Sequence, residues 1–99
     1  MYILHHYVTF KIGSSKLTNI EKSKLERFVQ TLPNDVNISI TGSADTKTGS
    51  QKRNQVLAQE RAEVVASFLK KFGREPKIQT EFDVDSEIEM SRAALIVVE

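Results

Sequence analysis

The chain of 99 residues has no cysteine, no tryptophan and only two prolines, and no apolar run approaches the roughly 20 residues of a membrane-spanning helix. The absence of cysteine excludes a disulfide framework and a thiolate metal site. Charges of the two signs nearly cancel, with a net charge of +1. The strongly basic face of a typical nucleic-acid-binding domain is therefore not expected, and we predict no nucleic acid partner.

A secretory signal is also missing from the start of the chain. The first ten residues, MYILHHYVTF, lack a charged beginning and a small-residue cleavage site. The length suits one domain, and the apolar content of 39% is ordinary for a globular protein. We therefore expect a single domain over residues 1–99. Composition fits both a cytosolic protein and a mature segment of a longer exported one.

Hydrophobic periodicity predicts four strands and two helices in the order β-α-β-α-β-β. The expected strands are Tyr2–Ile12, Val36–Thr41, Lys77–Phe82 and Ala93–Val98, and the expected helices run from Thr18 to before Pro33 and from near Gln51 to Phe72. This alternation predicts an α/β (α+β) fold, with two main helices packed on a mixed, partly parallel sheet. The apolar run of the last strand suits a strand buried on both faces.

Local signals predict where these elements begin and end. Thr18 and Glu21 fit a capping box, in which each side chain accepts a hydrogen bond from the other's backbone N–H. Gly42 is expected to end the second strand, and Gly73 the second helix. The side chains expected to point inwards from the first helix are Ile20, Leu25, Phe28, Val29 and Leu32.

The second expected helix carries polar residues on its apolar stripe. At about 100° per residue, Asn54, Leu57 and Arg61 share the stripe of Val65. A buried arginine almost always has a partner. We therefore expect a polar cleft under the N-terminal half of this helix, beside the loop that bears Asp45.

Two interpretations of this arrangement remain open. Asp45 and Arg61 can pair with each other, as an internal ion pair that serves the fold. Alternatively, Arg61 can hold a ligand carboxylate in a bidentate pair while Asp45 holds an ammonium group of the same ligand. The second interpretation selects a zwitterion of amino-acid type. Strand ends and helix N-termini of α/β sheets are common places for such ligands.

The segment GSADTKTGS from Gly42 to Ser50, followed by Asn54, Leu57 and Arg61 in the pattern N-x-x-L-x-x-x-R-A, resembles the OmpA-like C-terminal domain family. This family anchors outer-membrane proteins, Pal-type lipoproteins and MotB-type flagellar stators to peptidoglycan. The resemblance covers nearly the whole chain. It implies that residues 1–99 are the C-terminal part of a longer exported protein, on the periplasmic side of the outer membrane.

The resemblance also implies a ligand and the residues that bind it. Asp45 and Arg61 match the residues that bind diaminopimelate in the peptidoglycan stem peptide, Asn54 matches an asparagine that steadies the loop, and Arg92 matches an arginine that lines the cleft. The chain departs from the family pattern in the first-strand motif (residues 11–13), in the last motif (Ser91 and Ala93) and in the Asp45 loop. Residues 46–48 place three residues between Asp45 and the next glycine, where most members have two.

We therefore predict non-covalent binding of peptidoglycan, which anchors the outer membrane or an envelope complex to the cell wall. The alternative is a structural or protein-interaction domain in which Asp45 and Arg61 form only an internal ion pair. No catalytic pattern, phosphate loop or metal-ligand spacing is present, so we expect no enzyme and no cofactor. His5 and His6 are adjacent in a strand and point to opposite faces, which does not suit one metal ion.

Overall fold

The computed structural model describes residues 4–45, 51–84 and 93–99, and for Asp45, Gln51 and residues 79–84 it describes the backbone alone. These residues form the predicted order β-α-β-α-β-β. The elements are β1 (Leu4–Thr9), α1 (Asn19–Gln30), β2 (Ile38–Asp45), α2 (Gln51–Lys70), β3 (Lys77–Val84) and β4 (Ala93–Val98). The α/β fold predicted from the sequence is confirmed.

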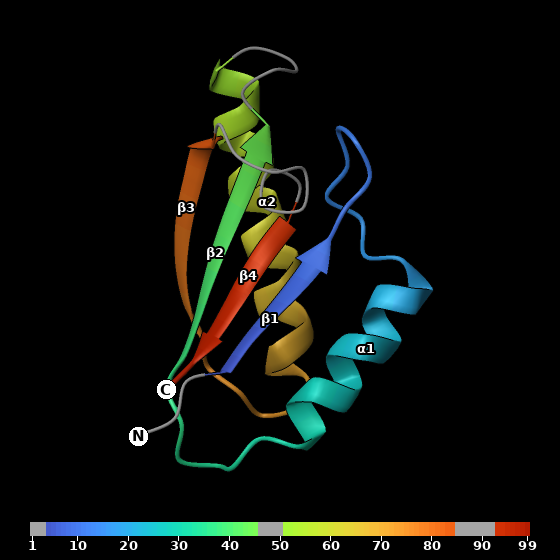
Figure 1. Ribbon diagram of the computed structural model, residues 1–99, viewed down its shortest axis with the longest axis vertical. Helices are drawn as coiled ribbons and strands as arrows, with labels where there is room; N and C mark the ends of the chain where they lie inside the picture. The colour runs from blue at the N-terminus through green and yellow to red at the C-terminus, as the bar shows by residue number, and fades with distance from the viewer. Residues whose placement is uncertain (1–3, 46–50, 85–92) are drawn as a thin grey trace.

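The four strands form one mixed sheet in the order β1-β4-β2-β3 (Figure 1). β2 and β3 are parallel and are joined through α2, whereas β4 is antiparallel to both of its neighbours, β1 and β2. The predicted partly parallel sheet is therefore present. In Figure 1, α2 lies behind the sheet and α1 lies beside β1.

β4 lies between two other strands, which explains its apolar sequence. Ala94, Ile96 and Val98 are buried on the side of α2, but Leu95 and Val97 on the other side are only half-buried. The expectation that β4 is buried on both faces holds only in part, because neither α1 nor α2 covers the second face.

α1 begins as predicted at Thr18, but its capping box is one-sided. The Thr18 hydroxyl accepts a hydrogen bond from the Glu21 N–H at 3.2 Å. The Glu21 carboxylate does not return this bond; its Oε1 accepts from the Thr9 N–H at 2.9 Å. The buried carboxylate therefore joins the start of α1 to the end of β1. The inward position predicted for Ile20 is wrong, because this side chain lies well round the helix from Leu25 and is 69% exposed.

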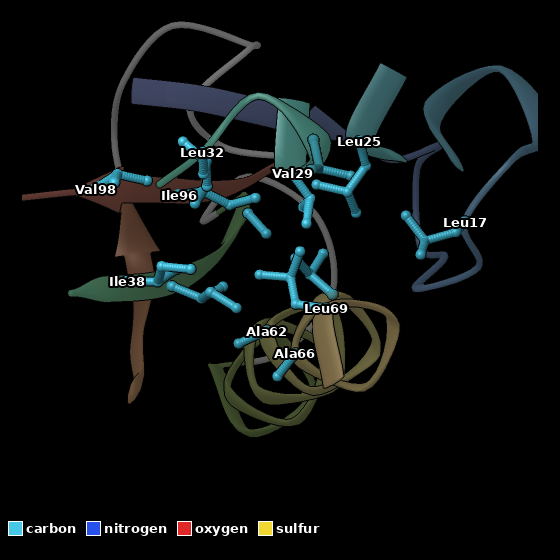
Figure 2. Packing of buried hydrophobic residues seen from close by; sticks show 14 of the residues in the cluster. Leu17, Leu25, Val29, Leu32, Ile38, Ala62, Ala66, Leu69, Ile96 and Val98 are labelled. Atoms are coloured by element: carbon cyan, nitrogen blue, oxygen red, sulfur yellow. The ribbon is translucent and has the colours of Figure 1, made fainter. Parts of the chain in front are cut away.

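The core lies between the sheet and the two helices (Figure 2). Leu25 and Val29 of α1 point towards Leu69 of α2, and Ile38 and Ile96 of the sheet close the space. Arg74 links the segment after α2 to the segment after α1, because its guanidinium donates hydrogen bonds to the carbonyl oxygens of Leu32 and Pro33. In the described ranges, neither helix combines the length and apolar character needed to cross a membrane.

The sequence suggested that Gly42 ends β2, but the strand continues to Asp45. A Cβ atom at this position would overlap the carbonyl oxygen of Ala58 and press on the backbone nitrogen of Ala62. Gly42 is therefore required where the backbone of α2 crosses β2 at close range. Gly73 behaves as predicted, since it follows α2 with a positive φ of 79°.

Candidate functional site

Two of the predicted site residues, Asp45 and Asn54, lie where β2 ends and α2 begins. Asp45 is the last residue of β2, and its backbone is in register with Val84 of β3 beyond an irregularity that starts at Ser43. The end of β2, the start of α2 and the loop after β1 all lie at the same end of the molecule (Figure 1). For Asp45 itself, the structure describes the backbone and not the side chain.

Arg61 occupies the centre of this region. Its side chain is completely buried, nearly three turns into α2. The guanidinium donates three hydrogen bonds to backbone carbonyl oxygens: Nε to Ser14 at 2.9 Å, Nη1 to Ser43 at 2.8 Å and Nη2 to Lys11 at 3.3 Å. A single side chain thus ties α2 both to β2 and to the loop between β1 and α1.

The charge of Arg61 is held in partly apolar surroundings. Its guanidinium carbon lies 5.4 Å from the centre of the Phe10 ring, within the range of a cation–π contact. Carbonyl oxygens are dipoles and carry no net charge, so these three bonds do not neutralise the cation. A carboxylate near the guanidinium is therefore favoured, whether it comes from the protein or from a ligand.

The polar stripe predicted on α2 is confirmed. Asn54 is buried in the first turns of the helix, and Leu57 and Val65 are buried on the same side as Arg61. The stripe continues into the core through Val65, as the periodicity indicated. Arg92, the fourth predicted site residue, lies outside the described residues.

Residue types do not indicate which atoms bind Arg61, because these atoms belong to the backbone. The nearest signal is Gly13, which has a φ of 68° in the turn that brings Lys11 and Ser14 together. The carbonyl oxygen of Lys11 accepts from the Ser14 N–H at 3.0 Å as well as from Arg61. The sequence also did not reveal the buried Ser43 hydroxyl, which donates to the Ala93 carbonyl oxygen at 3.0 Å.

A comparison with known protein families shows to which family this chain belongs. A model of the OmpA family matches residues 9–93, which include the whole region around Arg61. The chain belongs to the OmpA family. The resemblance seen in the sequence is thereby confirmed, and the loop, strand and helix that meet at Arg61 are the parts of this OmpA family domain that carry the motif.

Solved structures with the same fold come from several bacteria. The OmpA-like domain of FopA1 from Francisella tularensis superposes with a TM-score of 0.81 at 18% identity, covering 96% of this chain and 71% of that one. The peptidoglycan-associated lipoprotein from Burkholderia pseudomallei gives 0.78 at 23% identity, covering 94% and 89%. The periplasmic domain of Helicobacter pylori MotB gives 0.71 at 21% identity, covering 98% and 74%.

At these identities the structural matches establish the fold alone. No curated protein matches the chain in a sequence comparison. The family membership rests on the match over residues 9–93, and the arrangement of the two helices on the mixed sheet agrees with it.

Proposed function

We propose that this OmpA family domain binds peptidoglycan non-covalently through the diaminopimelate residue of the stem peptide. In this proposal, Asp45 pairs with the distal ammonium group of that residue and Arg61 attracts its distal carboxylate. The domain has no catalytic role; it anchors an exported envelope protein, of which it is the C-terminal part, from the periplasmic side of the outer membrane. Support comes from the family match and from one solved relative, which is a peptidoglycan-associated lipoprotein.

The contact between Arg61 and Ser43 is the observation that carries the proposal. The Nη1 donor reaches the carbonyl oxygen of a residue only two positions before Asp45. The cation is therefore close to the strand end that bears the aspartate. A guanidinium binds a carboxylate well in a bidentate pair, which is the role proposed for Arg61 towards the distal carboxylate of the ligand.

Asn54 and Arg92 have supporting roles in this proposal. Asn54 is buried at the start of α2, on the same stripe as Arg61, and would steady the loop that precedes the helix. Arg92 comes directly before β4 in the sequence and would line the cleft. Neither residue is expected to replace Asp45 or Arg61 as a direct partner of the zwitterion.

The second candidate function is a structural or protein-interaction domain without a wall ligand. The complete burial of Arg61 and its three backbone bonds favour this candidate, because they show that the arginine already serves the fold. The two candidates differ in what they expect of Asp45. Only the wall-binding candidate makes its carboxylate a partner of an external ammonium group.

Titration of the ¹⁵N-labelled domain with meso-diaminopimelate, followed by NMR, tests the proposal. We expect chemical shift changes that saturate and that centre on Ser43, Asn54 and Arg61. Lysine is the matched control ligand, since it has the distal ammonium but lacks the distal carboxylate. It should bind more weakly.

Asp45→Asn is the matched protein variant, because it keeps the size of the side chain and removes its charge. The variant should fold normally and lose the response to diaminopimelate. An unchanged spectrum of the wild-type domain at millimolar ligand would favour the second candidate.

A further inference from the structure

A second concave region lies on the flank of the molecule, between the β1–α1 loop, the start of α1 and the C-terminal half of α2. It consists of two hollows of about 250 and 310 Å³, which share Lys16, Leu17 and Lys22 and therefore form one groove. The remaining lining residues are Lys11, Ser14, Thr18, Asn19, Val64, Ser67, Phe68 and Lys71. We call this region the lysine groove.

The floor of the lysine groove is apolar. Leu17 is buried, whereas Val64 and Phe68 are half-buried against the core and show part of their surface to the groove. An exposed aromatic surface at the bottom of a concave region offers a place for one apolar side chain of a partner.

The rim of the lysine groove carries charge of one sign. Lys11, Lys16, Lys22 and Lys71 are exposed, and the described residues that line the two hollows include no aspartate or glutamate. Within the described part of the chain, none of these four ammonium groups lies within 4 Å of a carboxylate. Lys71 leans over the floor, with Nζ at 5.9 Å from the centre of the Phe68 ring. In a domain whose net charge is only +1, this is a local concentration of positive charge.

We propose that the lysine groove binds an acidic peptide segment of a partner protein, which inserts one large apolar side chain beside Phe68. Carboxylates on both sides of that side chain would pair with the rim lysines. This interaction does not depend on the proposed cell-wall site, since none of the groove residues is a predicted ligand of diaminopimelate. The two regions meet at the β1–α1 loop, where Lys11 and Ser14 line the groove and their carbonyl oxygens accept from Arg61.

The shape of the groove favours a peptide over an anionic membrane surface. The apolar floor is recessed between two helices and a loop, where a single side chain fits and a flat lipid surface does not reach. The rim lysines add long-range attraction, which raises the association rate and weakens as salt is added. The affinity is expected to be modest because exposed charge pairs each contribute little.

A synthetic peptide of glutamates around one central phenylalanine is a suitable probe. Titrated into the ¹⁵N-labelled domain at low salt, it should shift the signals of Leu17, Val64 and Phe68. A peptide with serine in place of the phenylalanine has the same charge, and we expect it to bind at least fivefold more weakly. Equal binding of the two peptides would contradict a role for the apolar floor.

Charge reversal of the rim tests the position of the site. The double variant Lys16→Glu/Lys71→Glu should bind the phenylalanine peptide roughly tenfold or more weakly. The single variant Lys71→Glu, which should also bind more weakly, has a matched control in Lys70→Glu, because both lower the net charge by the same amount. Lys70 is the exposed last residue of α2, next to Lys71, but does not line the groove. The control should bind as the wild type does, and an equal loss in the control would show that only net charge matters.

Two other results would overturn the proposal. One is co-sedimentation of the domain with phosphatidylglycerol vesicles, lost in the double variant, together with no response to either peptide. The other is concentration-dependent self-association that the double variant abolishes, with no peptide binding. Both readouts are independent of diaminopimelate, so a failure here would not affect the proposed wall site.

Discussion

At the scale of single residues, Arg61 is the centre of the molecule's polar interior. In the sequence, Arg61 falls on an apolar stripe, where it can serve either the fold or a ligand. The three bonds to the backbone of Lys11, Ser14 and Ser43 show that it serves the fold, and the buried charge makes a nearby carboxylate favourable. The two roles are compatible, but they require different tests.

Removing the Arg61 side chain should destabilise the domain strongly. Arg61→Ala removes the guanidinium from three backbone carbonyl groups, of which that of Lys11 keeps another donor, the Ser14 N–H, and it opens a cavity. We therefore expect the free energy of unfolding to fall by about 3–5 kcal/mol. Urea unfolding followed by circular dichroism measures this change. Arg61→Lys keeps the charge but not the geometry of the three hydrogen bonds. Its free energy of unfolding should lie between those of the wild type and Arg61→Ala. A loss below about 1 kcal/mol in Arg61→Ala would mean that these bonds contribute little. Because the Arg61 variants are expected to be less stable, ligand binding is better tested with a variant of Asp45.

His6 should make stability depend on pH. Its ring stacks on Phe28 of α1 with the centroids 4.7 Å apart, and Nε2 is enclosed without a hydrogen-bond partner among the described residues. Burial lowers the pKa of His6 from its usual 6.5, with Glu21 raising it and Lys24 lowering it to smaller extents. The unfolded chain therefore binds a proton more readily than the folded one, and stability should fall as the pH drops below about 6.5.

Urea midpoints measured between pH 7.5 and 5 check this dependence. His6→Phe keeps an aromatic ring against Phe28 and should remove most of the change within this window. His5 faces the other side of β1 and is exposed, so His5→Gln is the matched control and should keep the dependence. If His6→Phe and the wild type follow the same curve, another group is responsible.

The prediction from sequence succeeded for side chains that follow a period and failed for contacts with the backbone. Asn54, Leu57 and Arg61 lie on one stripe because helical geometry alone fixes their direction. Two acceptors of Arg61, Lys11 and Ser14, lie in a loop far away in the sequence, and the third, Ser43, lies in β2. A backbone carbonyl oxygen is present in every residue, so residue type does not reveal it. Ile20 is exposed although it is apolar, because its position in the first turn lies well round the helix from Leu25, and residue type alone does not indicate this angle.

At the scale of elements, the crossing of α2 over β2 positions the site. The close approach at Gly42 brings the backbone of Ala58 onto the strand, and this sets how far the Arg61 side chain reaches. The sequence correctly predicted all the elements and the partly parallel sheet. It placed the end of β2 too early, because a glycine that permits close packing looks the same in the sequence as one that ends a strand.

Gly42→Ala should therefore destabilise the domain, although it adds only one methyl group. The added Cβ overlaps the Ala58 carbonyl oxygen, which is backbone and cannot rotate away, so α2 must shift. We expect a loss of at least about 2 kcal/mol in thermal or urea unfolding. Thr41→Ala, at the neighbouring position on the opposite face of β2, should cost less than about 1 kcal/mol. Similar losses in the two variants would show that α2 can move freely relative to β2.

At the scale of the whole molecule, the two proposed binding regions are different surfaces that meet at the β1–α1 loop, through Lys11 and Ser14. The candidate wall site lies at the end of the sheet where β2 meets α2, and the lysine groove lies along the flank formed by α1 and α2. A domain of this kind would hold the cell wall with one surface and a protein partner with another. Several tethered copies on a polymeric wall would raise the effective affinity well above that of one stem peptide.

At the level of the sequence, only the family resemblance points to a specific ligand. Spacing and charge alone left two interpretations open, an internal ion pair or a zwitterionic ligand of amino-acid type, and the resemblance to the OmpA family implied diaminopimelate. The match over residues 9–93 confirms the family. The ligand itself remains a proposal that rests on Asp45 and Arg61.

Binding of the domain to two kinds of purified peptidoglycan tests the central claim most directly. One kind has diaminopimelate as the third residue of its stem peptide, and the other has lysine there, which lacks the distal carboxylate. In a pull-down with insoluble sacculi, we predict that the wild-type domain sediments with the diaminopimelate wall and much less with the lysine wall, and that Asp45→Asn stays in the supernatant with both. Equal sedimentation of wild type and Asp45→Asn, or equal binding to the two walls, would contradict the proposed recognition.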